Sequence, residues 1–328
     1  MKIDVFNHVF PIEFFEQVDG LMPDAAVKRW KSINTIYDMD ARLRMLDEFD
    51  DYQQIISMSQ PPTDAIAGPN DSPALTRVAN DGMARICREH PDRMPWFIAS
   101  LPMNNTAAAV AEVDRVIDEH NAVGFQLFTN VNNKALDQPE FRDIFAKIAE
   151  RGKIIWLHPT RPATHPDYLT EDRSFYEIFW GFGWAYETSV AMARIVCSGM
   201  FDEIPDLKII AHHWGAYAPH AEGRFTPAWE SRNAVMGDEQ GFAGKLEKPL
   251  VDYFKKDFYG DTAMFGSSSA FPTGVDYFGA DHVCFSTDAP FAPVAETFES
   301  LKRMELEANV QAKIYKQNAE RLMNRSFD

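Results

Sequence analysis

The sequence predicts an α/β fold, and within that class a (β/α)8 TIM barrel with a small insertion after the first strand. Eight short apolar runs occur along the chain, and longer stretches with helical patterns lie between them. Short, continuously apolar runs are typical of buried parallel strands. Repeated alternation of strand and helix favours a barrel. A doubly wound open sheet is the alternative, and the count of eight runs disfavours it.

The predicted strands share a short length and an apolar composition. They cover Ile3–Phe6, Gln54–Met58, Trp96–Leu101, Gly124–Phe128, Ile154–Leu157, Lys208–Ala211, Phe258–Gly260 and His282–Ser286.

The predicted helices repeat apolar residues at three- and four-residue spacing. Thr106–Asn121 has Thr106 as its expected N-cap. Pro139–Arg151 carries proline in its first turn and ends before Gly152. The remaining predicted helices are Glu187–Gly199, Phe242–Lys255, Ala295–Ala308 and the amphipathic Ala312–Asn324.

The segment 11–52 is longer than a single crossover between the first two strands requires. We interpret it as an insertion with helices around Ala25–Trp30 and Met39–Phe49. Because no internal repeat or low-complexity tract interrupts the chain, we expect residues 1–328 to form a single domain.

Composition excludes several classes of function. The 328 residues include 32 lysines and arginines against 49 aspartates and glutamates, which gives a net charge of −17. That charge argues against nucleic acid and against anionic membrane surfaces as partners. The three cysteines, Cys87, Cys197 and Cys284, form no C-x-x-C pair, so neither a disulfide framework nor a cysteine zinc site is expected. The charged N-terminus and the absence of a long apolar run predict a cytoplasmic protein.

Polar residues follow the predicted strands at the end where barrel enzymes carry their catalytic groups. These residues are Asn7 and His8, His158, His212 and His213, Asp261, and Asp288. Neutral imidazole nitrogens and a carboxylate oxygen are suitable ligands for a catalytic divalent metal ion. We therefore expect His8, His158 and Asp288 to bind metal, and we expect Asp261 to cap a helix or to orient a ligand. Alternation along the strand predicts that His212 points to the opposite face from His213.

No competing catalytic motif is present. The chain lacks a nucleophile elbow, a P-loop and a strand-associated dinucleotide-binding motif. The segment 175–186 is rich in aromatic residues, which are typical of core packing, of a pocket for an apolar ring, or of a subunit interface.

Several of these motifs, in this order, resemble the decarboxylase branch of the amidohydrolase superfamily, which includes aminocarboxymuconate-semialdehyde decarboxylase and γ-resorcylate decarboxylase. The Ile-Asp-x-x-x-His pattern ending at His8 is similar to the N-terminal metal motif of that branch. His158-Pro159, His213-Trp214-Gly215 and the segment 286–290 around Asp288 resemble its motifs on the fifth, sixth and eighth strands.

One position departs from the family pattern. The family has His-x-His or Glu-x-His after the first strand, and Phe6 occupies the earlier ligand position here. Three ligands with open positions still make an acceptable catalytic site, so we expect one divalent ion, zinc first and manganese as the alternative. Weaker metal binding, more room for substrate or water, or loss of the metal would each follow from Phe6.

The resemblance implies a metal-dependent, non-oxidative decarboxylase of an aromatic, hydroxybenzoate-like acid or of a conjugated unsaturated carboxylic acid. His213 or Asp288 would supply the proton, and we favour His213 because a metal-bound carboxylate is a poorer acid. The residues expected to contact the substrate are Phe6, Asn130, Trp184, Tyr186 and Phe291.

Two other functions stay open at this point. One is metal-dependent hydrolysis or hydration of a small lactone, amide or unsaturated acid, and the other is a metal-free barrel with a binding role. By analogy with the family we expect a homodimer or a larger homo-oligomer, with the segments 175–186 and 11–52 as candidate interfaces.

Overall fold

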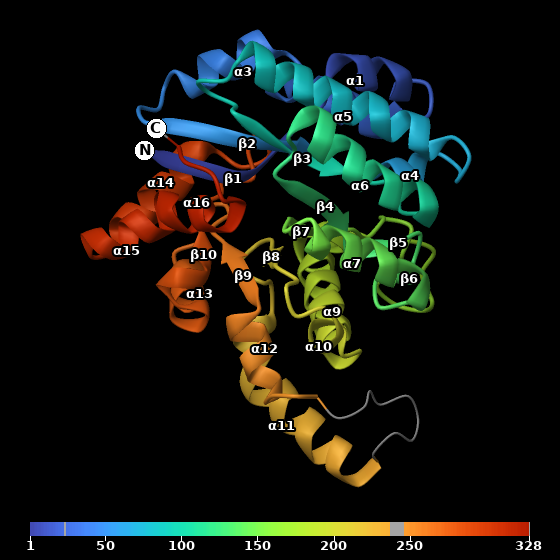
Figure 1. The fold of residues 1–328 in the computed structure, drawn as a ribbon, viewed down its shortest axis with the longest axis vertical. Helices are drawn as coiled ribbons and strands as arrows, with labels where there is room; N and C mark the ends of the chain where they lie inside the picture. The colour runs from blue at the N-terminus through green and yellow to red at the C-terminus, as the bar shows by residue number, and fades with distance from the viewer. Residues whose placement is uncertain (23, 237–245, 328) are drawn as a thin grey trace.

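Eight parallel strands curve into a nearly closed barrel with helices packed around it (Figure 1), which confirms the predicted fold class. The structure is a computed structural model that describes residues 1–22, 24–236 and 246–327. The strands pair in the order β1-β2-β3-β4-β7-β8-β9-β10. The last strand region meets the first where Val5 N donates to Phe285 O at 3.0 Å and His8 N donates to Ala289 O at 2.7 Å. All eight carboxyl ends therefore lie at one mouth of the barrel.

All eight predicted strands are present, with ends shifted by a few residues. Their bounds are β1 (Lys2–Val9), β2 (Tyr52–Met58), β3 (Trp96–Ser100), β4 (Gly124–Phe128), β7 (Ile154–His158), β8 (Ile209–Ala211), β9 (Phe258–Asp261) and β10 (Val283–Cys284). A short antiparallel pair, β5 (Asn130–Val131) and β6 (Lys134–Ala135), follows β4.

The helices fall between these strands and after the last one. The α-helices are α1 (Ile12–Val18), α2 (Asp24–Lys31), α3 (Met39–Leu46), α4 (Thr63–Ile66), α5 (Ser72–Glu89), α6 (Thr106–His120), α7 (Arg142–Glu150), α8 (Ile178–Gly181), α9 (Gly183–Cys197), α10 (Met200–Glu203), α11 (Ala218–Met236), α12 (Leu250–Lys256), α13 (Ala270–Phe278), α14 (Val294–Arg303), α15 (Ala308–Ala312) and α16 (Asn318–Met323). Short 3-10 turns are η1 (Asn34–Ile36), η2 (Pro139–Phe141) and η4 (Ala280–His282), and η5 (Lys313–Gln317) is a π-helical turn.

Two predicted helix boundaries are wrong in detail. Asn105, and not Thr106, caps α6, because its side-chain oxygen accepts a hydrogen bond from Ala108 N at 3.1 Å. Either residue type suits an N-cap, so composition alone does not separate two adjacent candidates. The predicted helix Ala295–Ala308 is interrupted after Arg303, and a new helix begins at Ala308.

The predicted helix Phe242–Lys255 begins later than its pattern indicates. Its described part starts at Leu250, directly after Pro249, and residues 242–245 lie outside the described residues. A proline disfavours helical backbone angles at the residue before it, here Lys248, so the helix begins after the proline.

Alternation along the strands sorts the apolar side chains into two cores. The inner core lies inside the barrel and includes Ile3, Ile55, Ile98, Ile154, Trp156 and Ile210. The outer core lies between the sheet and the helices and includes Ile56, Phe125, Leu127, Leu157 and Ala211. Leu322 and Met323 of α16 join the inner core, so this helix packs against the barrel interior.

Residues 10–51, between β1 and β2, contain α1, α2 and α3, as expected for the predicted insertion. A single side chain ties this segment to the site. Arg42 of α3 is fully buried; its Nη1 donates to His8 O at 3.1 Å and its Nη2 to Asn7 Oδ1 at 2.9 Å. Its Nε donates to Gln54 Oε1 at 2.8 Å. The buried guanidinium therefore fixes the end of β1, where His8 leaves the strand.

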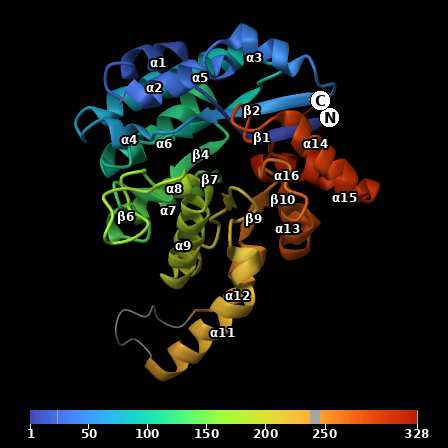
Figure 2. The ribbon, with the colours of Figure 1, turned by 180° about the vertical axis from the view of Figure 1, so that it is seen from behind.

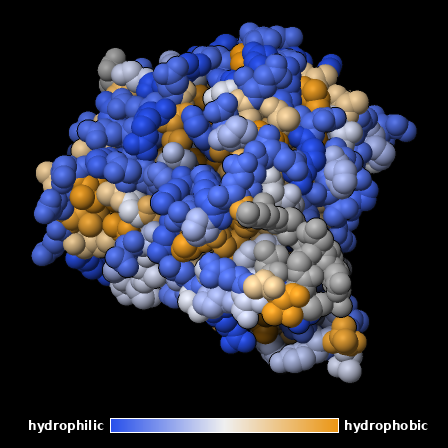
Figure 3. All heavy atoms as spheres, turned by 60° about the horizontal axis from the view of Figure 1, so that its bottom comes forward, coloured by the Kyte–Doolittle hydropathy of each residue, from blue (hydrophilic) through white to orange (hydrophobic). Residues whose placement is uncertain are grey.

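Some large apolar side chains remain at the surface. Leu169, Tyr176, Phe182 and Tyr186, which lie after β7, are among the exposed ones. On the face shown in Figure 3, hydrophobic residues gather in separate patches among hydrophilic ones. Helix α11 projects from the body of the molecule, whereas the two termini lie side by side (Figures 1 and 2). Within the described residues, no helix combines the length and apolar character needed to cross a membrane.

Candidate metal centre

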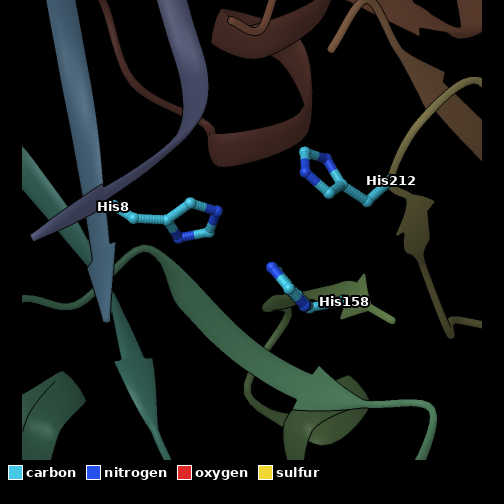
Figure 4. A group of neighbouring side chains, drawn as sticks. All are labelled: His8, His158 and His212. Carbon is cyan, nitrogen blue, oxygen red and sulfur yellow. The ribbon is translucent and has the colours of Figure 1, made fainter. Parts of the chain in front are cut away.

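Histidine side chains from three strands converge at the mouth of the barrel. Figure 4 shows the rings of His8, His158 and His212 pointing toward one shared space. Each offers a nitrogen that lies within 4.8 Å of those of the other two, and all three residues are buried. Because β1, β7 and β8 end at the same mouth, residues far apart in the sequence form one compact cluster.

The orientation of His8 is set by its backbone neighbour on β2. Its Nδ1 lies 3.2 Å from the carbonyl oxygen of Met58. Since a carbonyl oxygen only accepts, Nδ1 carries a hydrogen and Nε2 keeps its lone pair. That Nε2 is buried, has no hydrogen-bond partner in the described residues, and lies 3.1 Å from Asp288 Oδ1.

His158 at the end of β7 is oriented in the same way. Its Nδ1 lies 2.6 Å from the carbonyl oxygen of Pro159, which leaves its Nε2 available to the cluster. Gln60 donates to the same carbonyl at 2.7 Å and braces it. Burial, and then the neighbouring His8 and His212, hold the pKa of His158 well below its ordinary value of 6.5. A neutral imidazole is the form that binds a metal ion.

His212 lies inside the site, so the prediction that it points to the opposite face is wrong. Ile210 belongs to the inner core and Ala211 to the outer one, and alternation therefore turns His212 back into the barrel. Its Nδ1 donates to Asp261 Oδ2 at 2.5 Å, and its Nε2 lies 3.5 Å from Asp288 Oδ1. Burial alone would lower the pKa of His212, but Asp261 and Asp288 outweigh it and raise the pKa to about 9.

Asp261 takes the orienting role that the sequence suggested for it. Its carboxylate is fully buried at the end of β9. One oxygen accepts from the His212 ring, and the other accepts from the backbone nitrogens of His213 at 3.0 Å and Ala263 at 3.1 Å. The carboxylate is thus held on both sides, and its contact with the ring fixes how His212 faces the cluster.

His213 also reaches the site because the backbone turns sharply after β8. Residues His213, Trp214 and Ala216 all have positive φ, at 58°, 56° and 57°. His213 Nε2 lies 3.5 Å from Asp288 Oδ2. Burial and the neighbouring His212 lower the pKa of His213, which favours its neutral form.

Asp288 is the carboxylate on which the histidines converge. It has a φ of 63°, a conformation that is uncommon for a residue with a side chain, and its backbone nitrogen donates to Phe6 O at 3.2 Å. Burial would raise the pKa of Asp288, but the hydrogen bonds of His212, His213 and His8 together hold it well below 3.8. The group is therefore ionised and able to act as a ligand.

The donor set fits a divalent metal ion. Two groups of possible ligands occur among the described residues: His8 with His158 and His212, and His212 with His213 and Asp288. The Nε2 atoms of His8 and His212 are buried without hydrogen-bond partners. Buried polar atoms left unpartnered are costly, and a metal ion would compensate them.

Phe6 packs among the histidines instead of leaving a gap at the family's usual ligand position. Its ring lies 4.1 Å from that of His212, 5.1 Å from that of His8 and 5.6 Å from that of His158. The side chain is fully buried and belongs to the inner core.

The residues expected to contact substrate are placed differently from one another. The Phe291 ring lies 5.8 Å from that of His8, and the Trp184 ring lies 5.8 Å from that of His158. Asn130 donates to Thr160 O at 3.0 Å, and Tyr186 is half exposed. Phe6, Trp184 and Phe291 therefore border the centre, whereas no contact joins Asn130 or Tyr186 to the histidines.

Sequence reasoning also missed the groups that orient the histidines. The Met58 carbonyl and the Gln60 amide support His8 and His158. Their position directly after the apolar run of β2 was the available signal, because strand ends meet at the mouth. A carbonyl oxygen, however, leaves no mark in the choice of residue.

Comparisons with known proteins agree with this geometry. An amidohydrolase family model matches residues 3–325. The γ-resorcylate decarboxylase of Polaromonas sp. strain JS666 is 30% identical over 315 residues, which cover 91% of this chain and 92% of the relative. A crystal structure of a dihydroxybenzoic acid decarboxylase from the same strain, with bound manganese and the inhibitor 2-nitroresorcinol, has a TM-score of 0.80 at 26% identity and covers 99% of this chain and 98% of that one.

A crystal structure of 2,6-dihydroxybenzoate decarboxylase complexed with 2,6-dihydroxybenzoate has a TM-score of 0.80 at 25% identity and covers 99% of both chains. The resemblance to the decarboxylase branch is confirmed by these relatives. Because the family model extends over nearly the entire sequence, this chain belongs to the amidohydrolase family.

Proposed function

We propose that this protein is a metal-dependent, non-oxidative decarboxylase of a hydroxybenzoate-like aromatic acid. The observation that carries the proposal is the convergence of His8, His158 and His212 on Asp288 at the mouth of the barrel. Relatives that are similar over nearly the full chain are decarboxylases of dihydroxylated benzoates. The aromatic side chains of Trp184 and Phe291 beside the histidines suit a planar substrate ring.

His8, His158 and Asp288 would hold the metal ion. Bound there, a divalent ion supplies positive charge that binds a carboxylate and stabilises negative charge as it develops. Composition and ligand type favour zinc, and a related structure contains manganese, so the metal content of the purified protein decides between them.

His212 is the proton donor in this proposal, in place of His213. Asp261 and Asp288 hold a proton on His212, whereas His213 is held neutral. The donor transfers the Nε2 proton to the ring carbon that bears the carboxylate. The bond from that carbon to the carboxylate then breaks, its electron pair returns to the ring, carbon dioxide leaves, and His212 regains a proton from water.

The test is carbon dioxide release by metal-loaded protein from a panel of hydroxybenzoates, including 2,6-dihydroxybenzoate, and of muconate-type acids. His158→Ala should abolish turnover, while His90→Ala, a histidine at the end of α5 far from the centre in sequence and contacts, should not. Labelled oxygen from water in the product would indicate hydrolysis or hydration instead. If the metal-replete protein releases no carbon dioxide from any of these acids, the decarboxylase proposal is refuted.

We also propose that the protein forms a homodimer or larger homo-oligomer. The exposed side chains of Leu169, Tyr176 and Phe182 support an interface in the segment after β7, because clustered exposed apolar side chains are typical of contact surfaces. Light scattering after size exclusion measures the mass. A monomer at micromolar concentration would contradict the proposal.

A further inference from the structure

A small polar cavity lies beside the metal centre, at the carboxyl ends of β2, β3 and β4. It is lined by Ser59, Asp64, Gln126, Met58 and Phe128, among others. Its volume leaves room for about one water molecule. Leu127 packs in the outer core, so alternation directs Gln126 and Phe128 of β4 toward the barrel interior.

The cavity shares its wall with the metal centre. The carbonyl oxygen of Met58 accepts from His8 at 3.2 Å and from Gln126 Nε2 at 3.0 Å. The ring of Phe128 lies 5.0 Å from the ring of His158. A planar substrate held by the metal ligands would therefore lie next to the cavity.

Two polar atoms on the cavity wall lack partners. Ser59 Oγ and Gln126 Oε1 are buried and have no hydrogen-bond partner in the described residues, and their side chains belong to residues only 1% and 2% exposed. Because Gln126 Nε2 already donates to Met58, its free oxygen is an acceptor. Leaving a buried polar atom unpartnered is unfavourable, which indicates that a ligand supplies the missing partner.

A carboxyl group adds a third polar side chain. Asp64 of α4 is buried at 5% exposure and forms no ion pair in the described part of the chain. Burial raises the pKa of Asp64 to about 6, and at neutral pH its carboxylate is a further acceptor. The cavity thus presents acceptors and one hydroxyl, and no cation.

We propose that this cavity is a subsite that binds one hydrogen-bond-donating substituent of the substrate ring, a hydroxyl or an amino group, through Ser59, Gln126 and Asp64. The inference rests on the proposed function, because it requires a ring held by the metal centre. A methyl ether is excluded for two reasons: it has no hydrogen to donate, and its extra carbon exceeds a space for one water molecule.

The experiment measures binding by calorimetry to the manganese-loaded protein. The probes are catechol, resorcinol and hydroquinone, each paired with its monomethyl ether, and the three aminophenols. At least one dihydroxybenzene should bind about 10-fold more tightly than its ether, because methylation removes the donor and adds volume. The matching aminophenol then shows whether an amino group serves as well as a hydroxyl.

Ser59→Ala is the informative variant. The Ser59 hydroxyl has no partner within the described residues, so its removal should leave the free energy of unfolding of the ligand-free protein unchanged or raised. The preferred dihydroxybenzene should nevertheless bind about 3- to 10-fold more weakly, while its ether is unaffected. Thr297→Val removes another buried, unpartnered hydroxyl, on α14, and should change neither affinity.

Three outcomes overturn the subsite: no probe binds, every ether binds as tightly as its parent, or Ser59→Ala weakens both members of a pair equally. The cavity would then hold water only. Carbon dioxide release from the carboxylates is measured separately. Release without discrimination between the paired probes refutes the subsite alone, and discrimination without release keeps the subsite and refutes the decarboxylase proposal.

Discussion

Asp261→Asn tests whether His212 carries the extra proton of the site. Asp261 Oδ2 accepts from the ring at 2.5 Å, and both side chains are fully buried. In asparagine, an amide NH2 replaces one carboxylate oxygen. It faces either His212 Nδ1 or the backbone nitrogens of His213 and Ala263, and each orientation sets two donors against each other.

The magnitude follows from the pKa of His212. A value of about 9 in the folded metal-free protein, against 6.5 as its ordinary value, corresponds to roughly 3 kcal/mol of stability, shared between Asp261 and Asp288. Because the folded pKa lies above the unfolded one, this stabilisation is complete below pH of about 6.5 and is lost as the pH rises through about 9. Removing the charge of Asp261 should therefore cost roughly 2 kcal/mol more at pH of about 6 than at about 9.5.

The assay is urea unfolding of chelator-treated protein at both pH values. Groups that titrate alike in both proteins cancel in the difference between them. Asp202→Asn is the matched control: that carboxylate accepts from Tyr253 at 2.5 Å outside the centre, and its cost should not depend on pH over this range. An equal cost of Asp261→Asn at both pH values would show that the proton is not held on His212.

Four further predictions concern the ligands and their support. His158→Ala should lower metal content after dialysis by at least about 10-fold, measured by elemental analysis, since one of three proposed ligands is lost. His212→Gln should keep the metal and lower turnover roughly 100-fold or more; loss of metal equal to that of His158→Ala would make His212 a ligand instead. Phe6→His should raise metal affinity, seen as slower release to a chelator, and an unchanged rate would argue against this position as a ligand site. Arg42→Met should lower the free energy of unfolding by roughly 2–4 kcal/mol, because three buried acceptors lose their donor; a change below about 0.5 kcal/mol would contradict that account.

The barrel was predictable because its strands are buried on both faces. A run such as Ile154–Leu157 has apolar neighbours inside and outside the sheet, and it reads as continuous hydrophobicity. The clustering of His8, His158 and Asp288 followed from topology alone, since parallel strands present their carboxyl ends together.

His212 shows where such reasoning stopped. The prediction fixed the phase of the strand at His213, whereas the burial of Ile210 in the inner core sets it one residue earlier. Neither adjacent histidine is excluded from the site, because the backbone leaves β-geometry at His213 and turns both rings toward Asp288. Positive φ at His213, Trp214 and Ala216 has no signal in residue type, since none of these is glycine.

The charge of the site connects these observations to the acidity of the chain. With a net charge of −17, the protein as a whole repels a carboxylate substrate, so the mouth must be locally positive. A divalent ion is balanced by the two buried carboxylates Asp261 and Asp288, which leaves the centre neutral if His212 is neutral. A proton on His212 makes the centre positive, and an incoming carboxylate then neutralises it. The same proton thus attracts the substrate and is later delivered to its ring, which explains why a buried histidine is placed between two aspartates.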